Sequence, residues 1–119
     1  MKNFSAQYRV YYEDTDAGGV MYYANYLKFF ERARTDFLRA KNISQNEMLE
    51  KHQIAFLVRR CEADYIKAAK LDDLVEVDVV IEEIGAASII MQQEMRLKDV
   101  VLAKLKATIV CVDDKTLLT

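Results

Sequence analysis

Residues 13–34 read EDTDAGGVMYYANYLKFFERAR, and this stretch decides the fold. Asp14 and Asp16 precede the paired glycines Gly18 and Gly19, a composition that is typical of a loop. The residues that follow the glycines change to a helical period. The stretch therefore predicts a loop that carries acids and leads directly into a helix.

The helix is predicted from about Ala24 to Lys41. Its apolar residues recur at steps of four and three positions, and two leucines widen the stripe: Tyr26, Phe30, Ala33, Phe37 and Ala40, with Leu27 and Leu38 beside them. Charged residues fill much of the remaining surface. An apolar stripe of this width predicts a helix that lies along a sheet.

The rest of the chain predicts that sheet. Alternating or continuous runs of β-formers predict five strands: Phe4–Glu13, Ile54–Ile66, Leu74–Ile84, Ile89–Leu97 and Val100–Val112. A short helical turn is expected within Asn42–His52, where Ser44 and Glu47 fit a capping box. Short connections between the last strands imply hairpins. The predicted fold is therefore α+β, with an antiparallel sheet of about five strands and one long helix in a single domain, residues 1–119.

One helix covers only one face of such a sheet. If the second face carries the remaining alternating valines and isoleucines, it should pack against a second copy of the chain. We therefore expect a homodimer at least, and a homotetramer if two dimers associate.

The composition excludes several classes of protein. The 17 basic and 19 acidic residues give a formal charge of −2, which predicts no nucleic-acid partner. No apolar run reaches the roughly 18–20 residues that cross a bilayer, and the N-terminal residues contain no apolar signal-peptide core. We therefore expect a cytoplasmic protein, in which Cys61 and Cys111 are reduced and buried.

The motifs also exclude several kinds of site. The single histidine, His52, is expected on the surface, and no serine lies in a Gly-x-Ser-x-Gly elbow, so a nucleophilic triad is not expected. Neither the cysteines nor the two acids have the spacing or number of metal ligands. Gly18-Gly19 matches neither a P-loop nor a dinucleotide fingerprint. We therefore expect no metal and no cofactor.

The acids in front of the helix remain as candidates for chemistry. A helix N-terminus offers unpaired N–H groups and a partial positive charge, which can polarise a carbonyl group and stabilise an oxyanion. A nearby carboxylate can attack that carbonyl carbon or activate water. Acyl transfer to water therefore needs one acid and one well-aimed helix. The spacing alone leaves open that Asp14 and Asp16 are ordinary turn residues.

Longer motifs resemble a known family. They are Tyr11–Val20 (YYEDTDAGGV), Tyr22-x-x-Asn25-Tyr26-Leu, Phe30–Arg34 (FERAR), Asp64-Tyr65 and Ala69-x-Leu-Asp-Asp-Leu74. Together they are similar to the YbgC-like acyl-CoA thioesterases, which belong with the 4-hydroxybenzoyl-CoA thioesterases in the hotdog-fold superfamily. The resemblance implies a sheet wrapped around a central helix. It also implies hydrolysis of an acyl-CoA to a free carboxylic acid and CoA without a cofactor.

The resemblance also implies roles for residues. Asp16 would be the nucleophile or general base, Asp14 would support the loop, and Gly19 would let the loop approach the thioester. The carbonyl oxygen would be held by backbone N–H groups around Tyr23. Substrate contacts around the helix start would come from Val20, Tyr22, Asn25 and Tyr26. Many relatives have histidine in place of Tyr23, a change that is tolerable if this position acts through its backbone.

Coenzyme A carries phosphates, so basic residues should lie near its site. Arg59 and Arg60 are candidates by chemistry, together with Lys67, and the alternative is that they form a solvated strand edge.

Two other functions remain open at this stage. One is a hotdog dehydratase or hydratase of 3-hydroxyacyl thioesters, which would need a histidine such as His52 beside its acid. The other is a non-catalytic module that binds acyl carrier protein or a membrane-associated complex.

Overall fold

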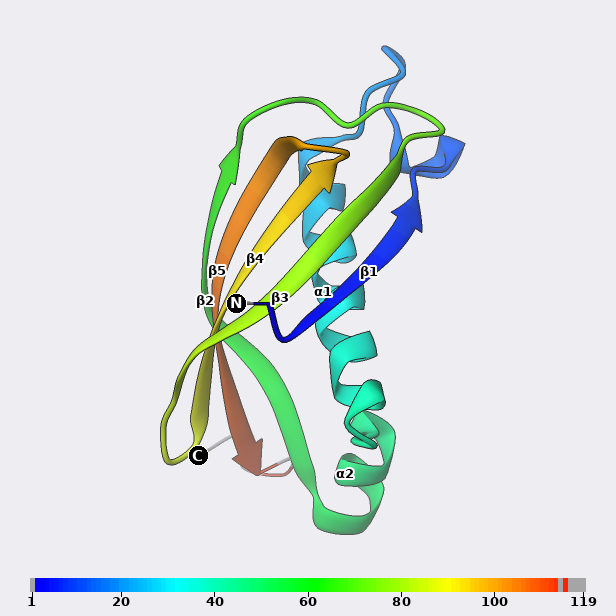
Figure 1. Cartoon of the computed structure of the whole chain (residues 1–119). Coiled ribbons are helices and arrows are strands. Elements are labelled where there is room, and N and C mark those ends of the chain that lie inside the picture. The colour runs from blue at the N-terminus through cyan, green and yellow to red at the C-terminus, as the bar shows by residue number, and fades with distance from the viewer. Residues whose placement is uncertain (1, 114, 116–119) are drawn as a thin grey trace.

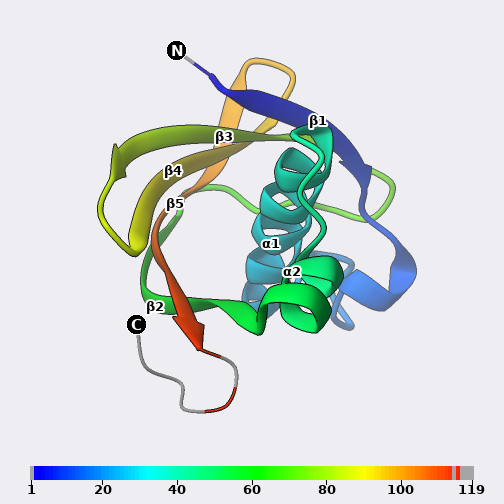
Figure 2. The same cartoon turned by 90° about the horizontal axis from the view of Figure 1, so that it is seen from below.

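The computed structural model, which describes residues 2–113 and 115, contains a five-stranded antiparallel sheet and two α-helices. The strands are β1 (Phe4–Arg9), β2 (Ile54–Tyr65), β3 (Leu74–Ile84), β4 (Ser88–Leu97) and β5 (Val100–Asp113), and the helices are α1 (Tyr23–Ala40) and α2 (Gln45–His52). Across the sheet the order is β1-β3-β4-β5-β2, so that β1 and β2 are the edge strands. Figures 1 and 2 show the sheet curling around α1. The predicted α+β architecture is confirmed.

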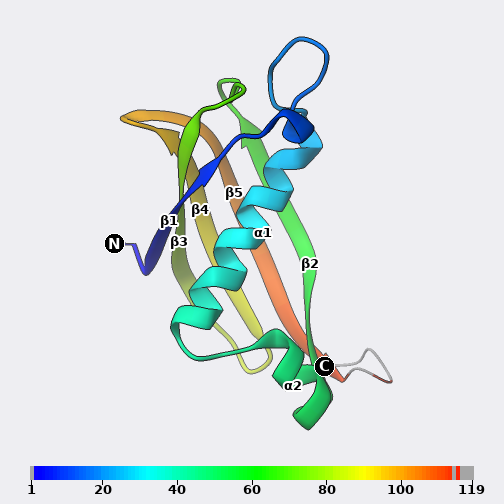
Figure 3. The same ribbon diagram turned by 90° about the vertical axis from the view of Figure 1, so that its right-hand side faces the viewer.

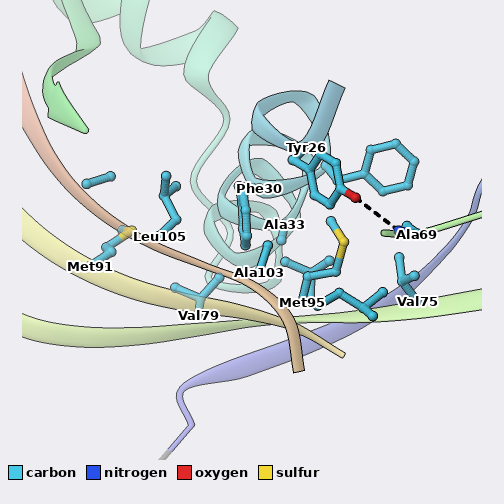
Figure 4. Packing of buried hydrophobic residues seen from close by; sticks show 14 of the residues in the cluster. Tyr26, Phe30, Ala33, Ala69, Val75, Val79, Met91, Met95, Ala103 and Leu105 are labelled. Atoms are coloured by element: carbon cyan, nitrogen blue, oxygen red, sulfur yellow. Dashed lines mark hydrogen bonds between the residues drawn. The ribbon is translucent and has the colours of Figure 1, made fainter. Parts of the chain in front are cut away.

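The helix α1 packs its aromatic side against the sheet. Phe29, Phe30 and Ala33 are fully buried, and Phe37 is 4 % exposed. They meet side chains from the inner faces of β3, β4 and β5, some of which Figure 4 draws: Val75, Val79, Met91, Met95, Ala103 and Leu105. The prediction also placed Leu27 and Ala40 in the apolar stripe, and this was wrong, because Leu27 is 40 % exposed and Ala40 is also exposed.

Two element boundaries differ from the prediction. The first strand ends at Arg9 and not at Glu13, because a 3-10 turn at Tyr12–Asp14 follows, in which the Asp14 carboxylate accepts the N–H of Tyr11 at 2.8 Å. The predicted short helical turn is a two-turn helix, α2. The Ser44 hydroxyl caps α2 as predicted by accepting the N–H of Glu47 at 3.2 Å.

The outer face of the sheet is charged. Val75, Val77 and Val79 of β3 point inward and are fully buried, whereas the residues between them are Glu76 and Asp78. The Arg96 guanidinium on β4 binds both of these carboxylates and also Glu94. The condition under which a second copy was expected to cover this face, alternating valines and isoleucines, is therefore not met by these residues.

The cysteines are also more accessible than predicted. Both thiols are free; Cys61 is exposed on the edge strand β2, and Cys111 is partly exposed near the end of β5. The expected burial was wrong for Cys61 because it lies on the edge strand β2, which has a neighbouring strand on one side only in the described sheet.

Two loops meet at one end of the molecule. The loop between β1 and α1 and the connection between β2 and β3 lie at the same end, whereas α2 lies at the other (Figures 1 and 3). Since α1 has 18 residues, its two ends are separated by about 27 Å. The motif residues 13–26 and 64–74 are thereby brought together.

Candidate active site

The loop before α1 is closed by its own backbone. The N–H of Asp16 donates to the carbonyl of Val20 at 2.9 Å, and the N–H of Gly19 donates to the carbonyl of Asp16 at 3.0 Å. Thr15 and Met21 form an isolated antiparallel β-bridge. Gly19 has φ +76°, a left-handed conformation in which a side chain would be strained. The glycine is therefore needed for the turn that returns the chain toward the helix.

Asp16 lies at the tip of this loop and is exposed. Its Oδ1 accepts the N–H of Gly18 at 2.9 Å, and the carboxylate has further lone pairs with which it could accept a proton or attack a substrate. An exposed carboxylate that is oriented by one backbone hydrogen bond is suited to act as a nucleophile or a general base.

Asp14, two residues earlier, is in the opposite environment. It is 5 % exposed, and its Oδ2 accepts the N–H of Tyr11 at 2.8 Å. Its Oδ1 accepts a long hydrogen bond, 3.4 Å, from the side-chain amide of Asn25 in the first turn of α1. The Asp14 carboxylate therefore links the turn before the loop to the helix after it.

The start of α1 is open. Tyr22 is the N-cap residue and makes no side-chain cap hydrogen bond, and the N–H groups of Tyr23 and Ala24 have no acceptor among the described residues. Unpaired N–H groups at a helix N-terminus carry partial positive charge and can accept an anion or a polarised carbonyl oxygen. The structure thus places these donors directly after the loop that carries Asp16.

Four tyrosines surround this helix start. The Tyr65 ring, at the end of β2, stands edge-on to Tyr23 at 6.1 Å and to Tyr26 at 5.2 Å between ring centroids, and Tyr22 lies 4.8 Å from Tyr23. Tyr23 raises the pKa of the Tyr22 phenol through side-chain hydrogen bonding. Burial, followed by nearby ionisable groups, raises the pKa of Tyr65. The phenols of Tyr22 and Tyr65 therefore stay protonated at neutral pH and can donate hydrogen bonds.

The residues predicted to contact substrate fall into two groups. Val20 is half-buried in the loop and bridges to Lys70, and Tyr22 is 49 % exposed beside the helix start. The polar groups of Asn25 and Tyr26, in contrast, bond within the protein, to Asp14 and to the N–H of Ala69. Their predicted contact with substrate stays a prediction.

Within one copy of the chain, Arg59 and Arg60 lie at a distance from the loop that carries Asp16. Both are exposed on β2, Arg59 in a bulge between the paired residues Val58 and Arg60, and Arg60 pairs with Glu62 at 2.8 Å. Five residues separate Arg60 from Tyr65, which is roughly 16 Å along a strand. Their role toward coenzyme A stays a prediction.

Sequence reasoning gave no role to Tyr65 and Ala69, although both stand in the motifs that carry the family resemblance. Their contacts with the helix start come from the connection between β2 and β3, which lies more than forty residues further along the chain than the loop. Only the motif spacing could have suggested their importance.

His52 ends α2, at the other end of α1 from Asp16, and it is exposed as predicted. Among the described residues, no three His, Cys, Asp or Glu side chains are grouped so that they could hold a metal ion. In the described part of the chain, neither helix has the length and apolar character of a membrane span.

Known proteins agree with this arrangement. A sequence model of the Thioesterase-like superfamily matches residues 10–119. The acyl-CoA thioesterase YbgC of Haemophilus influenzae is 49 % identical over 110 residues, which cover 92 % of this chain and 81 % of that protein. The acyl-CoA thioester hydrolase YbgC of Escherichia coli O6:H1 is 41 % identical over 106 residues, which cover 88 % and 78 %. The crystal structure of a probable thioesterase from Bartonella henselae superposes with a TM-score of 0.90 at 31 % identity, covering 93 % of this chain and 92 % of the other.

The fold and the open helix start with its acidic loop define the class as a hotdog-fold thioesterase. Within the thioesterase-like superfamily, the chain belongs to the YbgC acyl-CoA thioesterases. The predicted family, fold and enzyme class are therefore confirmed.

Proposed function

We propose that the chain hydrolyses an acyl-CoA thioester with Asp16 as the reacting carboxylate and the N–H groups at the start of α1 as the oxyanion site. One observation carries this proposal: of the two aspartates in the motif, only Asp16 is exposed, on a loop that leads into helix N–H groups without an acceptor among the described residues. Asp14 is buried, and its carboxylate binds groups of the protein itself.

The thioester carbonyl oxygen would bind the N–H groups of Tyr23 and Ala24, where the negative charge that develops on oxygen is stabilised. Asp16 then acts in one of two ways. As a nucleophile it attacks the carbonyl carbon, the C–S bond breaks, CoA leaves as a thiolate that is then protonated, and water hydrolyses the mixed anhydride. As a general base it takes a proton from a water molecule as that water attacks the same carbon, the C–S bond breaks, and CoA leaves as a thiolate that is then protonated.

In both routes Tyr23 acts through its backbone, and its side chain only borders the site. Both routes balance without a metal or organic cofactor, so we propose that none is needed. In a single-turnover reaction in water labelled with oxygen-18, label in Asp16 identifies the nucleophilic route, because it requires that water attack the Asp16 carbonyl of the anhydride; the general-base route puts the label in the product acid alone.

We further propose that the active form is an oligomer joined along β2. This edge strand presents unpaired backbone groups, and its exposed apolar side chains include Leu57, 41 % exposed, and Val58, 49 % exposed. A second copy here would bring its own residues next to Arg59 and Arg60, and the two arginines could then bind the phosphates of a coenzyme A held between the copies. Light scattering should give a dimer or tetramer mass, and a monomer of full activity would contradict this part of the proposal.

Thiol release from a panel of acyl-CoA and acyl-carrier thioesters tests the proposal. Asp16→Asn keeps the shape of the side chain and an oxygen for the N–H of Gly18, and we expect kcat to fall by about 10²–10⁴, the range for loss of a general base. Glu13→Gln is the matched control, because Glu13 is an exposed acid of the same segment. An Asp16→Asn protein as active as the parent would remove Asp16 from the mechanism.

The same panel tests the other readings. A parent that binds acyl carrier protein without hydrolysing any thioester would instead be the non-catalytic module. The dehydratase reading gains no support from the position of His52, which lies at the far end of α1.

A further inference from the structure

Tyr26 connects α1 to a segment that is distant in sequence. It is the fourth residue of the helix, is 4 % exposed, and its hydroxyl oxygen accepts the N–H of Ala69 at 2.9 Å (Figure 4). Ala69, in the connection between β2 and β3, is fully buried. The Tyr65 ring packs edge-on against the Tyr26 ring at 5.2 Å. The phenol is therefore committed to a buried hydrogen bond within the protein.

The segment around Ala69 in turn pairs with the loop that carries Asp16. The carbonyl of Ala69 accepts the N–H of Met21 at 2.7 Å, and the N–H of Leu71 donates to the carbonyl of Gly19 at 3.1 Å. Between them, Lys70 and Val20 form an isolated antiparallel β-bridge. The carbonyl of Val20 accepts the N–H of Asp16 at 2.9 Å. A series of hydrogen bonds thus connects the first turn of α1, through Ala69 and residues 20–21, to Asp16.

We propose that Tyr26 is a positioning residue, which holds the loop of Asp16 at a fixed distance from the helix N–H groups by binding Ala69. This inference rests on the proposed function, because it assumes that Asp16 and these N–H groups act on one carbonyl. It differs from the sequence-based expectation, in which Tyr26 contacts the substrate.

Such a link is needed because the two reacting parts lie on segments that could move independently. Between Asp16 and Tyr23 the chain contains Gly18 and Gly19, which restrict the backbone little. A displacement of about 1 Å in a reacting group can cost as much as a hundredfold in rate. The 69–71 segment removes this freedom by pairing with residues 19–21 while Tyr26 holds it to the helix.

Tyr26→Phe removes only the hydroxyl, and leaves the N–H of Ala69 buried without its acceptor. We expect kcat to fall by about tenfold while KM stays within about twofold, because the loss concerns alignment and not binding. Tyr8→Phe is the matched control. The Tyr8 hydroxyl donates to Asp36, which ties β1 to the second half of α1 away from the loop, so the control loses a comparable hydrogen bond. We expect both variants to melt at lower temperature, and only Tyr26→Phe to lose kcat.

Amide hydrogen exchange gives a readout that does not depend on turnover. In the parent, the amides of Ala69 and Met21 should exchange slowly, and in Tyr26→Phe both should exchange at least about tenfold faster. A parent in which the Ala69 amide exchanges like an exposed amide would overturn the proposal, whether or not the variant folds.

The kinetic outcomes separate this inference from the proposed function. If Asp16→Asn is inactive and Tyr26→Phe keeps the parent kcat, the positioning role is wrong and the function of Asp16 stands. A rise in KM of severalfold at unchanged kcat would make Tyr26 a substrate contact and would also overturn it. If Asp16→Asn keeps parent activity, the proposed function fails by itself.

Discussion

The middle and the start of α1 differ in how completely their polar groups are paired. In the middle, Phe30 is fully buried, and its carbonyl accepts a hydrogen bond of 3.0 Å from the side-chain amide of Gln93. The side-chain oxygen of Gln93 accepts a hydrogen bond of 2.9 Å from the Arg34 guanidinium. At the start, Tyr23 is 61 % exposed, and its N–H has no acceptor among the described residues.

This difference separates stability from chemistry along one helix. Gln93 is 2 % exposed in an apolar interior, where an amide is tolerated only if it is hydrogen-bonded, and here both of its ends are. Burial lowers the pKa of Arg34, so that its hydrogen bond to Gln93 matters more than it would in water. The start of the helix keeps its donors free, and free donors are what a substrate carbonyl requires.

Gln93→Leu would remove both hydrogen bonds that the Gln93 side chain makes to the middle of α1. The substitution leaves Arg34 without its acceptor in a half-buried position, and we expect a loss of about 1–3 kcal/mol in the free energy of unfolding, measured with urea. The neighbouring Gln92→Leu is the control, because Gln92 is exposed and its side chain donates to Glu82 on the surface. We expect kcat of the folded Gln93→Leu protein to stay within about twofold of the parent. Equal losses of stability in both variants would contradict the contrast.

The outer face of the sheet sharpens the comparison, since Arg96 forms ion pairs there with Glu76 and Asp78, whereas Asp16 forms none with a described residue. Hydrogen bonds from Arg96 lower the pKa of Glu76. Burial raises the pKa of Asp78, but hydrogen bonds from Arg96 and Ser5 and the charges of Arg96 and Lys2 together outweigh burial and lower that pKa too. Acids with lowered pKa values stabilise the fold above their unfolded values, about 3.9 for Asp and 4.3 for Glu, and this stability is lost as the pH falls through the folded values.

We therefore expect the parent to lose stability steeply below about pH 4. In Arg96→Met the loss between pH 5 and 3 should be shallower, because the acids have similar pKa values in the folded and unfolded chain. Urea unfolding across this range measures both slopes. Parallel curves for the two proteins would show that Arg96 does not set these pKa values.

Tyr23→Phe probes the start of the helix and should have the smallest effect. If Tyr23 acts through its backbone N–H, removing the hydroxyl changes kcat by less than about threefold. Tyr22→Phe, which removes the other phenol of this pair, is the comparison. A loss of a hundredfold or more in Tyr23→Phe alone would mean that the phenol takes part in the reaction.

The sequence predicted the elements well because their patterns are local. The helix period, the strand alternation and the cap at Ser44 depend on neighbours within a few residues, and all correspond to observed elements. Asp16 and the helix start could be identified for the same reason, since they lie within one motif of 22 residues.

The remaining features depend on contacts across the fold. The exposure of Leu27 follows from how α1 is rotated on the sheet. The pairing of Arg96 with Glu76 and Asp78 on the outer face could not be predicted, because it joins residues of two neighbouring strands. Gln93 and the Tyr26–Ala69 pair join segments that are dozens of residues apart, so no spacing in the sequence reveals them.

The central claim is that Asp16 serves the reaction and not the fold, and one paired measurement tests it most directly. Steady-state kcat and the free energy of unfolding should be measured on the same preparation of Asp16→Asn. We predict a fall in kcat of at least about a hundredfold, with a free energy of unfolding within about 0.5 kcal/mol of the parent. Parent-like turnover, or a loss of turnover that only follows a loss of folded protein, would contradict the account.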